Sequence, residues 1–269
     1  MSISARHDST APARRITANK VPQVTLFFWI VKILTTGFGE AASDALVRSA
    51  RVVAVVAVAL ALAASLAAQV RATRYVPWLY WLTVALVGVF GTMAADIPQF
   101  LGFPVWVSSL GYLVAVGAVF AAWYRVEGTL SFASITTRRR EGFYWAAVLA
   151  TFALGTAVGD LTADSWKLGN LASGVLFAAL FCVPLVARRW LGLGAIATFW
   201  IAYVLTRPLG ASFADWMGAP AFRGGLGIET AVVAVIWALA FAGVVVFLAA
   251  TRNDALSAAK EPQPAPAAG

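Results

Sequence analysis

Residues 28–44 read FWIVKILTTGFGEAASD. In this stretch an aromatic residue precedes a tryptophan, a glycine follows ten residues after that tryptophan, and an aspartate follows fifteen residues after it. The same spacing returns in YWLTVALVGVFGTMAAD, YWAAVLATFALGTAVGD and FWIAYVLTRPLGASFAD, which are residues 80–96, 144–160 and 199–215. Four copies with one spacing indicate a tandem repeat. The repeated residues are Trp29, Trp81, Trp145 and Trp200, then Gly39, Gly91, Gly155 and Gly210, and then Asp44, Asp96, Asp160 and Asp215.

The composition places these copies in a membrane protein. Of the 269 residues, 61% are hydrophobic and only 12% are charged, whereas about 25% are charged in an average soluble domain. The net charge is +8, but the basic residues lie between long apolar runs, so we expect no nucleic-acid partner. One cysteine and one histidine exclude a disulfide framework and cysteine- or histidine-rich metal sites.

The apolar runs predict eight membrane-spanning helices, because a span needs about 20 mostly apolar residues. Each tryptophan copy lies at the start of an odd-numbered span, and an even-numbered span follows it. The predicted fold is therefore an all-α, polytopic integral membrane protein of eight transmembrane helices in four parallel two-helix repeats. The spans are Val21–Phe38, Ala45–Ala68, Val76–Ala95, Phe103–Tyr124, Phe143–Gly159, Leu168–Ala187, Leu191–Leu209 and Leu226–Ala250.

The repeats divide the membrane domain, residues 21–252, into copies 1 to 4, at about residues 21–70, 73–125, 139–189 and 191–252. Residues 1–20 and 253–269 are expected to be disordered polar tails. Loops on the side of the two termini carry fourteen basic and five acidic residues. The positive-inside rule therefore predicts that both termini are cytoplasmic, in a chain that spans the inner (plasma) membrane many times.

The chain resembles a family of bacterial membrane proteins of unassigned function, built from four tandem two-helix repeats that each carry a signature tryptophan. This resemblance extends over about residues 21–250. It implies the eight-span fold and supplies no reaction. The fourth copy departs from the others because Arg207-Pro208 precedes its glycine. The stretches that carry the resemblance are Lys20-Val21-Pro22 with Phe28-Trp29, Gly39-Glu40 to Asp44, and Gly155 through Gly159-Asp160 to Asp164.

The rare polar residues of the first helices share one face. At about 100° per residue, the position eleven after the tryptophan and the aspartate both lie within roughly 60° of the tryptophan. Lys32 and Arg207 fall close to the same stripe, which should point away from lipid. Parallel copies favour an axis along the membrane normal. Either the first helices form an inner ring with the second helices outside, or two four-helix halves face each other.

Six acidic residues are the candidate ligands for a cation or a proton, since carboxylates suit hard cations and paired carboxylates can share a proton. The alternative is that each aspartate caps the next helix or ends a turn. Which metal, if any, would bind is unknown, and no cofactor is expected. The candidate acids are Glu40, Asp44, Asp96, Asp160, Asp164 and Asp215.

Two basic residues lie inside predicted spans. Lys32 has no charged neighbour on its own helix, so its expected partner is a repeat aspartate. Arg207-Pro208 suggests a kink with a freed carbonyl, with Arg207 alternatively satisfied by Asp215 or Glu229. The repeated glycines are expected to allow close helix packing, and the tryptophans to anchor the helices at the membrane interface.

These residues favour a transporter or channel for a small ion, a cation or a proton. An enzyme is not expected, because no predicted span contains a histidine and no phosphate-binding loop is present. Other open readings are a non-transporting scaffold or sensor subunit, a protein that handles lipid or organic solutes, and an anionic substrate held by Lys32 and Arg207. The sequence leaves the oligomeric state open.

Overall fold

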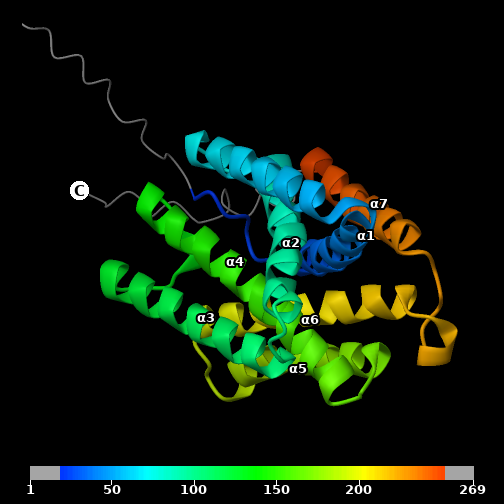
Figure 1. Cartoon of the computed structure of the whole chain (residues 1–269). Helices are drawn as coiled ribbons and strands as arrows, with labels where there is room; N and C mark the ends of the chain where they lie inside the picture. Colours follow the sequence, from blue (N-terminus) through cyan, green and yellow to red (C-terminus); the bar gives the residue numbers. More distant parts are fainter. Residues whose placement is uncertain (1–18, 252–269) are drawn as a thin grey trace, which may run out of the picture.

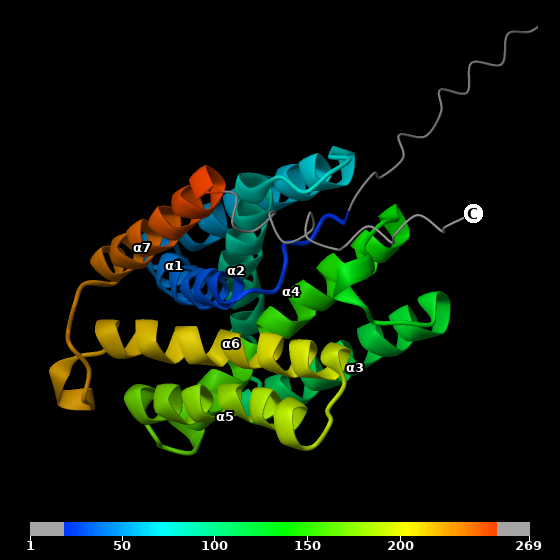
Figure 2. The ribbon, with the colours of Figure 1, turned by 180° about the vertical axis from the view of Figure 1, so that it is seen from behind.

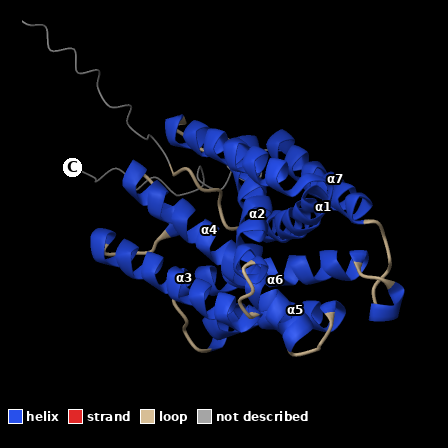
Figure 3. Cartoon of the chain, in the orientation of Figure 1, coloured by secondary structure: helices blue, strands red, loops and turns tan. Residues whose placement is uncertain are grey.

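The computed structural model describes residues 19–251, and over this range the regular structure is helical (Figures 1 and 3). The tails predicted for residues 1–20 and 253–269 lie outside this range except for Asn19 and Lys20. Lys20 is buried, so it belongs to the fold and not to a tail. The α-helices of the described range are α1 (Leu26–Arg71), α2 (Pro77–Phe100), α3 (Val105–Glu127), α4 (Arg138–Asp160), α5 (Asn170–Trp190), α6 (Ala195–Gly218) and α7 (Thr230–Thr251).

The predicted count of eight separate helices is not reproduced, since residues 19–251 form seven. The first two predicted spans lie on α1, which is 46 residues long and leaves helical geometry at Ala50 (φ −159°, ψ 79°). No glycine or proline occurs between Gly39 and Pro77. The chain therefore bends at Ala50 without forming a loop, because the residues that most strongly end helices are missing.

Six helices of the described range are long and apolar enough to cross a membrane by their length and composition. They are α1, α2, α3, α4 with the turn that follows it, α5 and α7. The sixth helix in chain order, α6, is not among them and carries Arg207 at its centre. Many leucine, valine and isoleucine side chains of these helices are exposed. These apolar surfaces indicate a membrane protein.

The first helices of the four copies form an inner ring, which is one of the two arrangements left open by the sequence. The ring consists of the first part of α1 and of α2, α4 and α6, each in contact with its two neighbours. The second helices lie outside and pack mainly on the first helix of the next copy. Figures 1 and 2 show α7 beside α1, α3 beside α4 and α5 beside α6. On the second part of α1, Ala54 and Val58 pack with Val89 and Met93 of α2.

Aromatic contacts close this ring. In each copy the aromatic residue before the tryptophan lies against the tryptophan of the next copy, and the fourth copy returns to the first. Three of these tryptophans are buried between helices. The expectation that the tryptophans anchor the helices at a membrane interface is therefore wrong for Trp81, Trp145 and Trp200, while Trp29 is partly exposed. The ring-centroid distances are 5.6 Å for Phe28–Trp81, 5.7 Å for Tyr80–Trp145, 6.1 Å for Tyr144–Trp200 and 5.8 Å for Phe199–Trp29.

The repeated glycines lie further along the same helices and let neighbouring first helices pack closely, as expected. Each faces the residue seven positions after the tryptophan of the next copy. A Cβ atom built on Gly39 would lie 2.8 Å from the carbonyl carbon of Gly88, and one on Gly155 would lie 2.5 Å from the Cβ of Arg207. The four contacts are Gly39–Gly88, Gly91–Phe152, Gly155–Arg207 and Gly210–Thr36.

Gly39→Ala is expected to lower the free energy of unfolding by about 1–3 kcal/mol, because the new Cβ meets backbone that cannot move aside. The measurement is the midpoint of thermal unfolding in detergent. Gly111→Ala in α3 is the control, since nothing lies within 4 Å of its added Cβ, and alanine favours a helix over glycine by about 1 kcal/mol. Equal midpoints for the two variants would contradict the close approach of α1 and α2.

Candidate functional site

The interior of the ring is built from residues four apart, which share one face of each helix. Starting at the aromatic residue before the tryptophan, the four copies place their residues in five layers. The aromatic layer is Phe28, Tyr80, Tyr144 and Phe199. The lysine layer is Lys32, Val84, Val148 and Tyr203. The arginine layer is Thr36, Gly88, Phe152 and Arg207. The glutamate layer is Glu40, Thr92, Thr156 and Ala211. The aspartate layer is Asp44, Asp96, Asp160 and Asp215.

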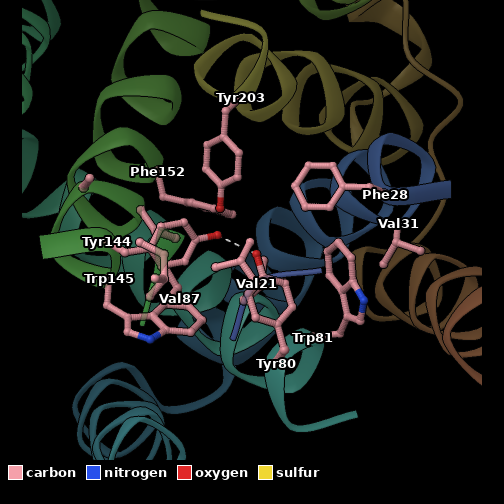
Figure 4. Close-up of a cluster of buried hydrophobic side chains, with 14 of the residues drawn as sticks. Val21, Phe28, Val31, Tyr80, Trp81, Val87, Tyr144, Trp145, Phe152 and Tyr203 are labelled. Carbon is pink, nitrogen blue, oxygen red and sulfur yellow. Dashed lines mark hydrogen bonds between the residues drawn. The ribbon is translucent and has the colours of Figure 1, made fainter. Parts of the chain in front are cut away.

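Burial changes sharply along these layers. Every residue of the first four layers is buried, and all four aspartates are partly exposed. The interior is therefore closed through most of its length and opens at the aspartate layer. Figure 4 shows the closed end, where Phe28, Tyr80, Trp81, Tyr144 and Trp145 crowd together.

The aspartate layer opens into a cavity of about 500 Å³. All six acids predicted as ligands line it, so the structure brings together carboxylates from the four copies. Gln99, Asn170 and Thr230 add neutral polar groups to its wall, and Arg48 and Arg223 add two guanidinium groups. The acids are Glu40, Asp44, Asp96, Asp160, Asp164 and Asp215.

The four aspartates do not cap a following helix with their side chains, which the sequence left as an alternative; Asp160 precedes a π-helical turn but makes no capping hydrogen bond to it. Asp44, Asp96 and Asp215 lie inside helices that continue beyond them. Asp160 is the last residue of α4, but a π-helical turn, Leu161–Ser165, follows directly. This turn carries Asp164 to the same cavity, and π-helical turns often occur at functional sites.

The cavity is not a preformed metal site. Within residues 19–251, no three histidine, cysteine, aspartate or glutamate side chains lie close enough together to hold a metal ion. Asp160 accepts a hydrogen bond from Nε2 of Gln99 at 3.1 Å, and Asp44 lies 3.8 Å from Arg48. A cation in this cavity would therefore meet several separate carboxylates and keep much of its water shell.

A buried ion pair forms the floor of the cavity. Nη2 of Arg207 lies 2.5 Å from Oε2 of Glu40 and also donates to the hydroxyl of Thr92. Nη1 of Arg207 donates to the carbonyl of Thr36 at 3.2 Å. These contacts join copy 4 to copies 1 and 2 across the interior. The expected partners of Arg207, Asp215 and Glu229, are wrong, because Glu40 lies nearer to the arginine layer.

Lys32 lies deeper, in the lysine layer, and is almost fully buried. Its Nζ lies 3.9 Å from the ring centre of Phe152 and 4.2 Å from that of Tyr203. Among the described residues Nζ has no hydrogen-bond partner. The expected ion pair with a repeat aspartate is wrong, since the aspartate layer is twelve residues, or roughly 18 Å, further along the helix.

Sequence reasoning missed a second buried ion pair at the opposite end of the ring. Nζ of Lys20 lies 2.6 Å from Oε2 of Glu141 and donates to the carbonyl of Gln69 at 2.8 Å. Glu141 lies in the first turn of α4, whose N-cap Thr137 accepts a hydrogen bond from Arg140. The sequence signal for this pair was the stretch Lys20-Val21-Pro22. That stretch supported the family resemblance, but no role was predicted for Lys20.

Sequence reasoning also missed three buried tyrosines in the first two layers. The hydroxyls of Tyr80 and Tyr144 lie 2.5 Å apart. The hydroxyl of Tyr203 points toward that of Tyr144 (Figure 4). Tyr203 lies four residues before Arg207, and Tyr80 and Tyr144 lie twelve residues before Thr92 and Thr156, so a spacing in multiples of four could have identified them.

Removing one partner of the Arg207–Glu40 pair is expected to cost about 3–5 kcal/mol of unfolding free energy, because it leaves an uncompensated buried charge. The double variant Glu40→Gln/Arg207→Met should lose less than the sum of the two single variants, as measured by thermal unfolding in detergent. Arg48→Met removes a largely exposed ion pair and should cost under about 1 kcal/mol. Additive losses would contradict a direct pair.

Comparison with known families supports the repeat. The family described as Repeat of Unknown Function (DUF347) matches the chain four times, at residues 27–75, 79–129, 143–192 and 198–254. Each match contains one repeat tryptophan, glycine and aspartate. No curated protein and no solved structure matches the chain. The four matches cover most of the chain and confirm the predicted four-copy repeat, so this chain belongs to the DUF347 repeat family.

Proposed function

We propose that this chain is a membrane transporter or channel for a small ion, a cation or a proton, which moves along the axis of the ring. One observation carries the proposal: six carboxylates contributed by all four copies line a single cavity of about 500 Å³ at one end of that axis. A carboxylate in a membrane-spanning segment costs about 2.5–3.5 kcal/mol on insertion scales. Such residues in membrane helices commonly mark an ion pathway.

The proposed topology has eight spans, with four first helices inside and four second helices facing lipid. The low burial of α3, α5 and α7 supports the outer position, and the basic loops support cytoplasmic termini. The aspartate layer then faces the outside of the cell. The Lys20–Glu141 pair lies at the cytoplasmic end.

The proposed route begins with electrostatic attraction. A polar cavity lined by one sign of charge raises the local concentration of counter-ions. A cation or proton that reaches the floor competes with Arg207 for Glu40, since both bind the same carboxylate. Displacement of the guanidinium would then open the layer that the ion pair closes.

A scaffold would use its polar residues as a structural ion-pair network. Within the described range, however, the only ion pair of the aspartate layer joins Asp44 to Arg48, whose side chain is 71% exposed. An exposed pair of this kind contributes little stability. This distribution supports transport over the scaffold reading.

An apolar pocket favours a second candidate function, the handling of a hydrophobic solute or lipid chain. It has a volume of about 340 Å³, lies between α3, α4, α5 and α6, and is lined by Trp106, Leu113, Gly155 and Phe177 among others. Fatty-acid binding by the purified chain that is lost in Leu113→Trp would support this candidate. Binding that is unchanged would remove it.

Ion flux into proteoliposomes tests the proposal. We expect the wild-type chain to move at least one of H⁺, K⁺, Mg²⁺ and Mn²⁺, and Asp96→Asn and Asp160→Asn each to lower that flux by about tenfold, because they remove attraction for the ion. Lys32→Ala, tested alongside, reports whether the deeper layers take part.

Glu127→Gln is the matched control, since it removes a carboxylate that pairs with Arg139 and Arg140 away from the cavity. Its flux should equal that of the wild type. Flux that survives both aspartate substitutions in folded protein would contradict the proposed site. Folded wild-type protein that moves none of the four ions would contradict transport and leave the scaffold or solute readings.

A further inference from the structure

The layers beneath the cavity contain buried ionisable groups that a simple ion cavity does not need. Lys32, Tyr203, Tyr144 and Tyr80 occupy the lysine and aromatic layers, and each is at most 1% exposed. They lie between the Arg207–Glu40 pair at the cavity floor and the Lys20–Glu141 pair at the other end. Their neighbours in these two layers are Phe28, Val84, Val148 and Phe199.

These four groups follow one another along the axis. One link, between Tyr144 and Tyr80, is a hydrogen bond, whereas among the described residues Nζ of Lys32 and the hydroxyl of Tyr203 have no hydrogen-bond partner and must move to transfer a proton. Nζ of Lys32 lies 4.2 Å from the ring centre of Tyr203. The hydroxyl of Tyr203 points toward that of Tyr144 (Figure 4), and the Tyr144 and Tyr80 hydroxyls lie 2.5 Å apart. Each of the four residues lies on a different first helix, so together they include all four copies.

The packing around Lys32 and the three tyrosines leaves no space for a hydrated metal ion. Phe152 is fully buried and lies against Lys32, and the aromatic layer is closed by ring contacts of 5.6–6.1 Å. A proton needs no such space, because it passes between oxygen and nitrogen atoms that are in hydrogen-bond reach.

We infer that the ion which crosses the closed layers is a proton, and that Lys32 and the three tyrosines carry it. This inference rests on the proposed function, and it narrows the ion from a small cation or proton to a proton. The flexible side chain of Lys32 lets its amine move away from the Tyr203 ring toward Glu40. Glu40 lies eight residues, or roughly 12 Å, further along α1, so the Glu40 side chain must reach back to meet the amine.

The transfer is balanced at each step. Glu40, the one carboxyl of the glutamate layer, takes up a proton from the cavity, releases Arg207 and passes its O–H proton to the neutral Lys32 amine, which becomes an ammonium ion. The ammonium gives one proton to the Tyr203 oxygen while the Tyr203 hydroxyl proton passes to Tyr144 and that of Tyr144 to Tyr80. The Tyr80 proton then passes to the Glu141 carboxylate, a step that needs side-chain movement because Tyr80 and Glu141 are not hydrogen-bonded to each other in the structure. Glu141 then releases its proton on the side of the ring that holds the Lys20–Glu141 pair, so one proton enters, one leaves and no electrons move, and rotation of the hydroxyls restores the starting state.

Proton flux into proteoliposomes that contain a pH-sensitive dye tests this inference, with an imposed membrane potential as the driving force. Tyr144→Phe and Tyr203→Phe keep the aromatic ring and remove only the hydroxyl. We expect each to lower proton flux by about tenfold or more, as for loss of a proton-transfer group. Tyr112→Phe is the matched control, because its hydroxyl donates to the carbonyl of Ala94 on α2 and lies outside the layers. It should retain the wild-type flux.

The same vesicles are tested for uptake of K⁺, Mg²⁺ and Mn²⁺, so the two proposals can fail separately. Wild-type protein that moves a metal cation but no protons would overturn the proton inference and keep the proposed function. Proton flux that persists in both tyrosine variants would overturn the tyrosine route alone. A folded protein that moves no ion would overturn both. If Tyr144→Phe does not fold, Tyr203→Phe decides the outcome.

Discussion

Close approach at glycine is the constraint on which the ring depends. At one level of the structure each first helix presents a glycine to the next copy, and a Cβ atom at any of the four positions would lie under 3.0 Å from a neighbouring atom. Helices can come this near only where the side chain is missing. The same nearness lets the aromatic residue of each copy reach the next tryptophan and buries the layers between these two contacts. The interior opens only beyond the glycines, where the aspartates meet the cavity.

The four copies repeat the same helix arrangement, but the side chains that they place inside the ring differ. Lys32 and Tyr203 occupy equivalent positions in copies 1 and 4, while copies 2 and 3 place valine there. Arg207 likewise corresponds to Thr36, Gly88 and Phe152, and only copy 4 can supply the guanidinium that holds Glu40. The four-fold repeat thus places one aspartate from each copy in the aspartate layer. The buried charged residues along the axis occur where a single copy departs from the repeat. The functional proposal uses both, since the acids attract an ion and the unequal residues determine what can pass beyond them.

The sequence predicts the repeat, the helices, the close packing at glycine and the set of acids, because one spacing governs all of them. It does not predict which copy lies beside which, so it misassigns the partners of Lys32 and Arg207. Glu40 binds Arg207 because copies 1 and 4 are neighbours in the ring, and this follows only from the tertiary fold. Lys20 appeared to belong to a polar tail, since its acceptor on Glu141 is 121 residues away. The helix count fails for a local reason, as no residue between Gly39 and Pro77 forces a loop.

Intramolecular cross-linking tests the ring most directly. In a Cys182→Ser background, which removes the exposed free thiol, the pair Asp44→Cys and Asp160→Cys places thiols on copies 1 and 3, at opposite sides of the proposed ring. Both positions line one cavity, so a short bifunctional maleimide should join them within a single chain and add the mass of one reagent with both thiols consumed. The pair Asp44→Cys and Glu127→Cys, at opposite ends, should not be joined. Two separate adducts on Asp44→Cys/Asp160→Cys, without a link, would contradict a ring that gathers the four copies around one axis.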